Sequence, residues 1–432
     1  MATLTNPTKI RELQRALYRR AKENRSFRFY ALYDKVYRKD MLEHAYALVK
    51  AKRGAPGPDG VTFEEIEQNG RDGLLEELHE ALKTKQYKPD AVRRVYIPKA
   101  SGGERPLGIP NIRDRVVQMA AKLVLEPIFE ADFEEDSYGF RPKKDAHQAL
   151  DAVEESLHEG MWWVLDADIT AYFDTIPHDR LMKTVAERVV DGSMLRLIKA
   201  FLEAPIIDDR DGGGPRRNRE GTPQGGVISP LLANIYLHLV DRNFRGQVER
   251  GALSGRLVRY ADDLVMLAPR PPTIERQWLE TLLKRLGLTL HPTKTRIVNA
   301  EEEQFDFLGH TLRWTYVHRV KGHELYFDIC KKSQQRIRDE LKRRTKHTAL
   351  SLEQVVSGLN TYIRGARQYF RRVVARRKTK LDYFVYGRVA RWWRHKHKLA
   401  RPAWWLARDR ALWTTHGLER WYHPSNRSEP AR

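Results

Sequence analysis

Two adjacent aspartates, Asp262 and Asp263, stand between two apolar runs in the stretch RLVRYADDLVML, residues 256–267. The flanking runs favour β-strands, whereas aspartate is a poor strand residue and usually marks a turn. We therefore predict a tight hairpin with both aspartates at or near its tip. A turn needs only one such residue, and adjacent carboxylates repel each other unless a positive charge lies beside them. A divalent cation is the obvious partner, and a polar hairpin tip is the plainer alternative.

A second segment with carboxylates, VLDADITAYFDTI, covers residues 164–176. Asp168 lies at the end of a predicted buried strand, and Asp166 shares its face because side chains alternate along a strand. Carboxylates from a strand end and a hairpin tip would form an oxygen-rich site for Mg²⁺. Two such ions about 3.5–4 Å apart stabilise the attacking and leaving oxygens of an in-line phosphoryl transfer. The residues alone leave this site and a pair of surface turns equally open.

Cations and glycines cluster at a predicted turn, KASGGER, residues 99–105. Two short extended runs, RRVYIPK and RPLGIP, contribute to its two sides, so it reads as the turn of a hairpin. Lys99 and Arg105 would lie near backbone amides that the glycines leave accessible, which makes a phosphate cradle. A solvated β-turn is the alternative.

The elements that must position these residues are mostly helices. Further strands are predicted near residues 295–299 and 305–313. Helices are predicted over residues 8–52, 61–86, 111–131 and 143–159, from about 178, after the glycine-rich loop 210–226, and over 273–287. From about residue 331 the chain reads as all-helical. The predicted fold class is α+β, a helix-rich body followed by a basic helical region.

Positive charge is concentrated in the last quarter of the chain. The formal net charge is +21, and residues 331–432 contain 27 Lys and Arg against 7 Asp and Glu. The same segment holds six of the ten tryptophans, whereas disordered tails are poor in aromatic residues. A folded basic surface with aromatic stacking platforms fits a nucleic-acid partner, and a solvated basic tail is the alternative.

Other features limit the class of protein. No apolar run reaches the roughly 18 residues of a membrane span, so we expect no membrane partner. The first residues, MATLTNPTKIRELQRALYRRAK, lack the apolar core of a signal peptide. Cys330 is the only cysteine, which excludes an internal disulfide and a zinc site built on paired cysteines. We expect a bacterial, cytoplasmic protein associated with nucleic acid.

Seven blocks follow one another in an order that resembles the successive motifs of a reverse transcriptase: RRVYIPKASGGERPLGIP, SYGFRP, DADITAYFDTI, GTPQGGVISPLLANIYL, YADD, LGLTLHPTKT and FDFLGH. More narrowly, about residues 25–400 resemble the group II intron-encoded reverse transcriptase/maturase family. The resemblance implies a right-hand polymerase, with fingers and a palm containing an antiparallel sheet, followed by an α-helical thumb or maturase domain. The implied ranges are an N-terminal helical extension at 1–60, fingers at 61–160, palm at 161–315, thumb/maturase at 331–400 and a short basic DNA-binding remnant at 401–432.

The resemblance also implies the active site. Asp168, Asp262 and Asp263 match the catalytic aspartates, which hold two Mg²⁺ ions, with Mn²⁺ as a substitute. Ile169 would add its backbone carbonyl to the metal ligands. Phe173 matches the steric gate, a ring that occupies the place of a ribose 2′-hydroxyl and selects deoxynucleotides. The implied reaction is attack of a 3′-hydroxyl on the α-phosphate of a dNTP, with release of pyrophosphate.

The remaining matches concern the nucleotide and the nucleic acids. The residues that would contact the incoming dNTP are Lys99, Arg105, Gln224 and Lys294. Lys294 would also protonate pyrophosphate, and an ordinary surface lysine is the alternative. Arg93 would contact the template. Three residues match the primer grip, which holds the end of the primer: Phe307, Leu308 and Gly309.

The stretch LNTYIRGARQYF, residues 359–370, resembles the signature of the maturase or thumb domain. Its spacing fits one helix whose apolar stripe, Leu359, Ile363, Ala366 and Phe370, faces the core. The residues expected to face RNA are Arg364, Arg367, Arg371 and Arg372.

The paired cysteines of the zinc-linked endonuclease domain that many family members carry are missing, so the chain resembles endonuclease-lacking members. The implied function is RNA-directed DNA synthesis, with the host intron RNA as template, together with intron RNA binding and splicing and a part in retrotransposition. The implied partners are template and intron RNA, DNA primer or target, and dNTPs; a dimer is one oligomeric state left open. Two alternatives stay open: a splicing cofactor without polymerase activity, and a domesticated reverse transcriptase in defence or repair.

Overall fold

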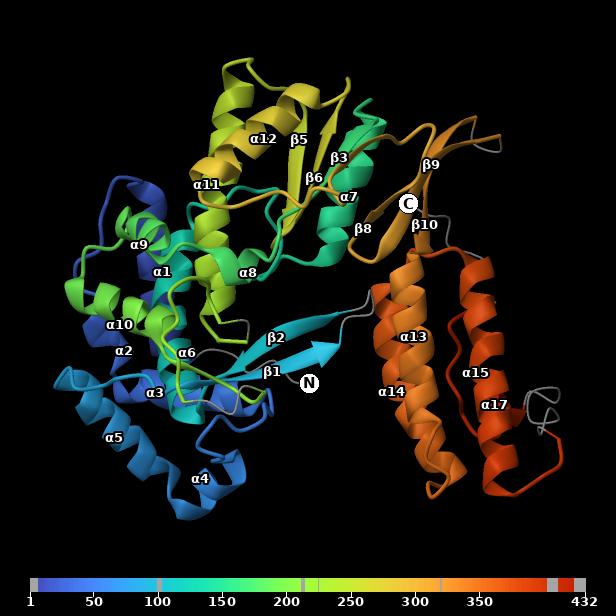
Figure 1. The fold of residues 1–432 in the computed structure, drawn as a ribbon, viewed down its shortest axis with the longest axis horizontal. Helices are drawn as coiled ribbons and strands as arrows, with labels where there is room; N and C mark the ends of the chain where they lie inside the picture. Colours follow the sequence, from blue (N-terminus) through green and yellow to red (C-terminus); the bar gives the residue numbers. More distant parts are fainter. Residues whose placement is uncertain are drawn as a thin grey trace. The chain divides into compact units, whose positions relative to one another are not determined.

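The computed structural model describes residues 7–98, 103–210, 214–223, 225–318, 321–401 and 411–422. Two compact units divide the chain: the first runs to Ile297, and the second continues from Val298. Figure 1 shows their elements, coloured along the sequence. Among the described residues, no helix is long and apolar enough to cross a membrane.

The N-terminal part of the first unit is helical. Its helices are α1 (Thr8–Glu23), α2 (Tyr33–Val36), α3 (Lys39–Lys50), α4 (Phe63–Asn69), α5 (Arg71–Lys83) and α6 (Ile112–Glu130). Helix α6 is buried around most of its circumference, which is typical of a helix at the centre of a core. Helices α1 and α3 pack against it.

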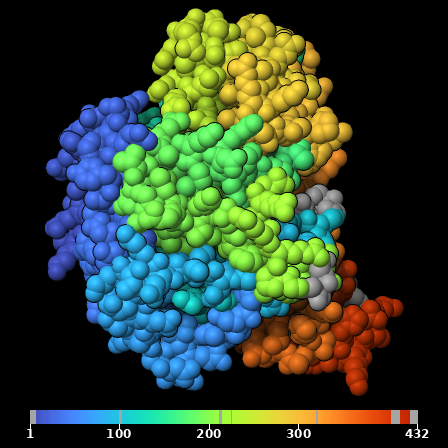
Figure 2. All heavy atoms as spheres, turned by 60° about the vertical axis from the view of Figure 1, so that its left-hand side comes forward, coloured from blue at the N-terminus to red at the C-terminus, as the bar shows by residue number. Residues whose placement is uncertain are grey.

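The segment between α1 and α2 lies against the connection between α9 (His178–Ala186) and α10 (Gly192–Glu203). The amide of Phe29 donates to the Arg188 carbonyl at 2.8 Å. The Asp191 carboxylate accepts from the amide of Leu32, also at 2.8 Å. Figure 2 shows the corresponding dark-blue and green surfaces side by side. The segment between α1 and α2 is therefore part of the same packed unit as α9 and α10.

Two small sheets carry the residues of interest in the first unit. β1 (Val92–Pro98) and β2 (Glu104–Ile109) form the predicted antiparallel hairpin, and β4 (Ile206–Asp208) pairs in parallel with the other edge of β1. The second sheet has the order β5-β6-β3-β7. Its strands are β5 (Arg256–Tyr260), β6 (Asp263–Ala268), β3 (Trp163–Asp168) and β7 (Arg296–Asn299). The division between the two units falls within β7.

Helices α7 (Ala146–His158), α8 (Tyr172–Thr175), α11 (Ser229–Glu249) and α12 (Thr273–Arg285) complete the first unit. Helix α7 packs against β5 and β6. Residues 264–268 of β6 are all buried, as expected for a strand covered on both faces. A strand so enclosed gives the residues at its end a fixed position.

The second unit combines a sheet of order β10-β9-β8 with helices. Its elements are β8 (Phe305–Phe307), β9 (His310–Val317), β10 (Gly322–Ile329), α13 (Lys331–Arg344), α14 (Leu352–Tyr369), α15 (Ala375–Lys396) and α17 (Ala411–Thr414). The predicted apolar stripe of α14 is confirmed at Leu359 and Ile363, which are fully buried, and at Phe370, which lies just beyond the helix and is 3% exposed. Ala366, its fourth member, is only half-buried.

The predicted α+β class is confirmed, and several element predictions need correction. The expected helix over 8–52 is interrupted between Asn24 and Leu32, and the one over 61–86 is interrupted at Gly70. The strands β4 and β10 and helix α10 were not predicted. The predicted domain ranges stay predictions; the division into compact units falls between Ile297 and Val298.

Candidate active site

The three predicted aspartates meet at one end of the β5-β6-β3-β7 sheet. β3 pairs with β6 in antiparallel orientation, and Asp168 lies opposite Asp263 in the last pair of the register. Tyr260 and Asp263 close the β5–β6 hairpin, so Ala261 and Asp262 alone form its turn. Ala261 adopts a φ of 58°, a left-handed conformation that such short turns require. The predicted hairpin is therefore confirmed, and its tip adjoins the strand end that carries Asp168.

The electrostatic environment of Asp262 fits a cation site. Burial raises the pKa of its carboxyl above the usual range, and the charge of Asp168 raises it further. Arg105 and Arg259 act in the opposite direction on this pKa. Carboxylates that oppose each other's ionisation are stabilised together by a bound cation. Arg105, which the sequence assigns to the dNTP triphosphate, is thus close enough to act on the same carboxylate.

Lys294 also lies at this site. Its Nζ atom is 2.7 Å from Oδ2 of Asp168, and its side chain is 61% exposed. The segment before it is fixed by backbone hydrogen bonds, because the amide of His291 donates to the Asp168 carbonyl at 2.7 Å. The structure thus places Lys294 beside Asp168, and its predicted contact with the triphosphate stays a prediction.

Ile169 pairs with Leu290 in an antiparallel bridge. The two hydrogen bonds of this bridge use the carbonyl of Asp168 and the amide of Thr170, not the groups of Ile169 itself. In such a pair the backbone groups of the bridged residue point to the opposite side. The Ile169 carbonyl consequently faces the side on which β6 and its turn lie, where a metal ligand is expected.

A buried hydrogen-bond network around Arg259 links the hairpin turn to helix α11. Arg259 is fully buried and donates to both carboxylate oxygens of Asp241. Its Nη1 donates at 2.9 Å to Oδ1 of Asn234 and at 2.9 Å to the carbonyl of Ala261. A buried charge of this kind is tolerated only with such partners, so the turn is tied to helix α11.

The SYGFRP segment presses against the same turn. A Cβ atom on Gly139 would lie 2.3 Å from the amide nitrogen of Ala261, so only glycine fits there. Asn234 Nδ2 donates to the Gly139 carbonyl at 2.7 Å, and the Tyr138 amide donates to the Arg259 carbonyl at 2.8 Å. The sequence prediction missed this support, although an arginine inside the apolar run LVRY signalled a buried partner.

Phe173 lies beside the glycine-rich loop before α11. The Thr222 amide donates to the Phe173 carbonyl at 2.7 Å, and a Cβ on Gly221 would lie 2.7 Å from the same oxygen. A Cβ on Gly225 would lie 2.3 Å from the Gly108 carbonyl of β2. The loop therefore runs between Phe173 and the β1–β2 hairpin. Gln224, predicted to contact the nucleotide, lies outside the described residues.

The β1–β2 hairpin carries the other predicted nucleotide and template residues. Arg105 is exposed on β2 opposite Ile97, and Lys99 lies outside the described residues. Arg93 forms an ion pair with Asp209, with Nη2 2.9 Å from Oδ2. A template contact by Arg93 remains a prediction, and it would compete with this exposed ion pair.

Two family matches and one similar protein show the family of the chain. The family described as "Reverse transcriptase (RNA-dependent DNA polymerase)" matches residues 97–312, half of the chain. The "Group II intron, maturase-specific domain" matches residues 334–413. Protein YkfC of Escherichia coli is 36% identical over 341 residues, 70% of this chain and 88% of that protein.

The chain belongs to the group II intron-encoded reverse transcriptase/maturase family. Two other relatives are longer. The group II intron-encoded protein LtrA of Lactococcus lactis is 36% identical over 51% of this chain and 36% of its own length. An uncharacterized 91 kDa protein in the cob intron of Schizosaccharomyces pombe is 29% identical over 64% of this chain and 40% of its own length. By membership, the chain is an RNA-directed DNA polymerase that depends on divalent metal and binds RNA and DNA.

Among solved structures, a partial Cas6-RT-Cas1–Cas2 complex matches 59% of this chain and 40% of that chain. The sequence identity is 22% and the TM-score is 0.35, so the likeness adds nothing to the assignment.

In the second unit of this reverse transcriptase, the predicted primer grip is a two-residue hairpin. Phe307 and His310 form the last pair, and the turn residues Leu308 and Gly309 have φ values of 47° and 74°. Positive φ at both positions is typical of a type I′ turn, and leucine is strained there. The Tyr369 hydroxyl donates to the Leu308 carbonyl at 2.9 Å. The hairpin tip is thus fixed to the end of α14, and its contact with a primer stays a prediction.

The arginines of α14 have partners within the protein. Arg367 donates to the Glu419 carboxylate at 2.9 Å and to the Arg420 carbonyl at 2.8 Å. Arg364, 59% exposed, lies 3.7 Å from Glu419. Arg372 stacks over the Phe327 ring at 3.9 Å. Arg367 therefore holds the C-terminal segment in place, and RNA binding by these arginines remains a prediction.

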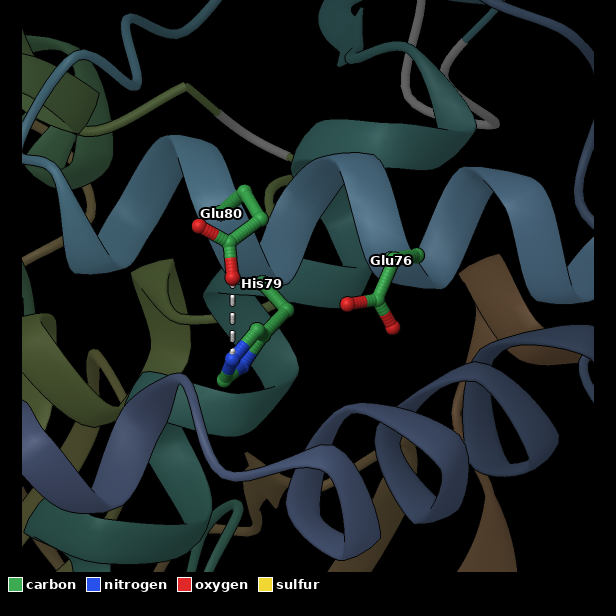
Figure 3. Close-up of side chains that lie close together, drawn as sticks. All are labelled: Glu76, His79 and Glu80. Carbon is green, nitrogen blue, oxygen red and sulfur yellow. Dashed lines mark ion pairs between the residues drawn. The ribbon is translucent and has the colours of Figure 1, made fainter.

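A group of metal-ligand types also occurs on α5, away from the predicted site. Figure 3 shows Glu76, His79 and Glu80, whose ligand atoms lie within 4.8 Å of one another. Lys39 lies 2.6 Å from the Glu76 carboxylate, and Lys83 lies 3.2 Å from that of Glu80. Each carboxylate already has a cationic partner, so we assign this group to surface ion pairing.

Proposed function

We propose that this reverse transcriptase copies RNA, including its host intron RNA, into DNA by nucleotidyl transfer at Asp168, Asp262 and Asp263. The observation that carries the proposal is the register, in which Asp168 faces Asp263 and the turn of the hairpin holds Asp262. Three carboxylates on two adjoining elements, with Lys294 beside them, match the donor set that phosphoryl transfer requires.

These residues fit Mg²⁺. The donors are all oxygens, which is the preference of Mg²⁺, and the mutual effect of Asp168 and Asp262 on ionisation is what a divalent cation offsets. Asp168, Asp262, Asp263 and the Ile169 carbonyl would hold two ions, with Mn²⁺ as a substitute. Bound ions would lower the pKa of the attacking hydroxyl and neutralise the phosphate oxygens.

The protein's own groups would orient the nucleotide. Arg105, with Lys99, would neutralise the triphosphate of the dNTP. Phe173, whose backbone the loop of Gly221 and Thr222 holds in place, would exclude a ribose 2′-hydroxyl. Lys294 would exchange its ion pair with Asp168 for the departing pyrophosphate and donate a proton to it.

The decisive experiment is dNTP incorporation by the purified protein on a primed RNA template with Mg²⁺, and in parallel with Mn²⁺. The test variant is Asp262→Ala with Asp263→Ala. The matched control is Asp166→Asn, because Asp166 lies on the same face of β3 and pairs with Arg296 at 3.5 Å. Synthesis by the wild type and the control, but not by the double variant, supports the proposal. Equal synthesis by all three proteins would refute it.

A second function, promotion of intron splicing, is favoured by the maturase-specific match over residues 334–413 and by the basic second unit. We expect the Asp262→Ala, Asp263→Ala variant to keep this role, because the aspartates belong to the first unit. A splicing assay with the host intron RNA, with and without each protein, separates the two functions. The cytoplasmic location and the DNA targets expected from the sequence are part of the same proposal, and a dimer stays one oligomeric state that the sequence leaves open.

A further inference from the structure

A cavity of about 600 Å³ opens in the second unit, on the outer face of the β9–β10 sheet beside α15. β9 contributes Thr311, Arg313 and Thr315 to its lining, and α15 contributes Arg376, Arg377 and Lys380. Tyr326 of β10 stands opposite Arg313 in the strand register, so both side chains leave the same face of the sheet. We call this cavity and its lining the sheet–helix groove.

The groove lining carries more positive than negative charge. Four basic side chains line it, and Asp328 is the single carboxylate in the lining. Arg377 is bound to Asp328 through two contacts, at 2.7 Å and 2.6 Å, which neutralises both groups. Arg313, Arg376 and Lys380 are exposed and have no hydrogen-bond or ion-pair partner among the residues that the structure describes. Two carboxylates border the lining: Asp306 accepts from Thr311 at 2.6 Å, and Glu324 stands opposite Thr315 in the register. Three cations without a protein partner around one concave surface still favour a polyanion.

Exposed aromatic rings accompany these cations. Tyr326 is 38% exposed at the groove, and Tyr383 on α15 is 70% exposed. The spacing of Arg376, Lys380 and Tyr383 places all three on one face of α15, so the surface continues along the helix. Cations that alternate with exposed rings are the arrangement that binds phosphates and stacks unpaired bases.

We propose that the sheet–helix groove binds a single-stranded segment of nucleic acid. Arg313, Arg376 and Lys380 contact the phosphates, and Tyr326 and Tyr383 stack with bases that are not paired in a duplex. This inference rests on the proposed function in one respect, the choice of nucleic acid as the class of ligand. All groove residues belong to the second unit, so binding there does not require the aspartates of the first.

The test is fluorescence anisotropy of labelled oligouridylate and oligodeoxythymidylate with the full chain, over a series of salt concentrations. The groove variant is Arg313→Ala, Arg376→Ala, Lys380→Ala. The matched control removes three exposed cations of α13 in the same unit, Lys331→Ala, Lys332→Ala, Arg336→Ala. We expect the groove variant to bind about tenfold more weakly, with a slope of log affinity on log salt shallower by about 2, since each phosphate contact on a single strand contributes about 0.7.

Tyrosine variants test the stacking separately. Tyr326→Ala should weaken binding by about tenfold, whereas Tyr326→Phe, which keeps the ring, should bind like the wild type. Tighter binding of oligouridylate than of oligodeoxythymidylate would identify RNA as the ligand. Equal binding of the two would show that the groove recognises only the phosphates and bases that RNA and DNA share. Equal losses in the groove and control variants, or unchanged binding in Tyr326→Ala, would overturn the proposal in favour of bulk charge or an acidic protein partner.

Polymerisation distinguishes this inference from the function on which it rests. The groove variant should still extend a primer already annealed to a template at saturating concentration. The Asp262→Ala, Asp263→Ala variant should lose extension and keep oligonucleotide binding. If the wild type extends primers but does not bind single-stranded oligonucleotides, the groove proposal is refuted and the proposed polymerase function is not.

Discussion

Replacing Arg259 with lysine tests whether the buried network around Arg259 positions the aspartates that we propose to be catalytic. Arg259 is fully buried, and its guanidinium joins Asp241 to the carbonyl of Ala261, one residue before Asp262. Lysine keeps the positive charge for Asp241 but offers no planar fork of donors. The substitution therefore removes the link to the turn and leaves the carboxylates themselves in place.

The cost follows from the bonds that are lost. Arg259 donates to Asn234 and to Ala261 at 2.9 Å each, and lysine paired with Asp241 cannot make both contacts. Two charge-assisted hydrogen bonds at about 1.5 kcal/mol each give a loss of about 3 kcal/mol in the free energy of unfolding. A displacement of about 1 Å at a catalytic group costs about 100-fold in rate, and we expect a loss of that order in kcat.

The matched control is Arg256→Lys on the same strand. Arg256 donates to Asp136 at 2.8 Å and to Glu155 at 2.6 Å, is 25% exposed, and does not contact the turn. Single-turnover incorporation is measured against Mg²⁺ concentration for both variants, together with the Kd for primed template. For Arg259→Lys we expect a lower kcat and weaker apparent Mg²⁺ affinity with an unchanged Kd; for Arg256→Lys, both kinetic values should match the wild type.

Three results would refute the reasoning. Arg259→Lys with wild-type kcat and Mg²⁺ dependence would show that the turn holds its position without the network. Equal losses of activity in the two lysine variants would point to strand stability instead of positioning. A lowered activity that returns fully when stability is restored by a stabilising condition would assign the arginine a purely structural role.

Three further predictions concern other residues. Lys294→Met should lower kcat by about 100-fold or more in a pre-steady-state incorporation assay, and should leave the melting temperature unchanged, because exposed ion pairs contribute at most about 1 kcal/mol. Leu308→Asn should match or exceed wild-type stability in urea, because asparagine tolerates positive φ, while primer extension at limiting primer falls. Burial raises the pKa of Asp382 to about 6, so the folded chain holds this proton more tightly than the unfolded chain and stability falls as pH rises from about 4 to about 6. The free energy of unfolding measured in urea should therefore be higher at about pH 5 than at about pH 7, and Asp382→Asn should reduce this difference.

Local patterns predicted the elements whose partners lie nearby in the sequence. The β1–β2 and β5–β6 hairpins were readable because turn residues separate two apolar runs. The break after α1 was not, since it depends on contacts more than 160 residues away, such as that of Arg188 Nη1 with the carbonyl of Phe27 at 3.1 Å. β4 is only three residues long and exists through its parallel pairing with β1, in which Ile206 faces Val92.

The candidate site likewise has residues that the sequence predicted and residues that it did not, because their partners lie far away in the chain. Aspartates in YADD and DADI are unusual enough in their strands to be singled out by type and spacing. Arg259 was part of the quoted stretch, but its partners Asn234 and Asp241 lie 25 and 18 residues earlier, on a helix read only as apolar. Their spacing of seven places both on one face of α11, which was the available signal for a shared buried partner.

The exposed fractions of the side chains indicate which ion pairs at the candidate active site are costly to break and which separate easily. Arg259 is fully buried, Asp241 is 5% exposed, and breaking a buried pair of this kind costs about 3–5 kcal/mol. Lys294 is 61% exposed and Asp168 is 30% exposed, and a pair so open to solvent costs at most about 1 kcal/mol to separate. We therefore expect the network of Arg259 and Asp241 to stay intact during a reaction cycle, and Lys294 to leave Asp168 when a cation takes its place. The same lysine would then become available to the triphosphate only once the aspartates are neutralised by metal, which couples nucleotide contact to metal binding.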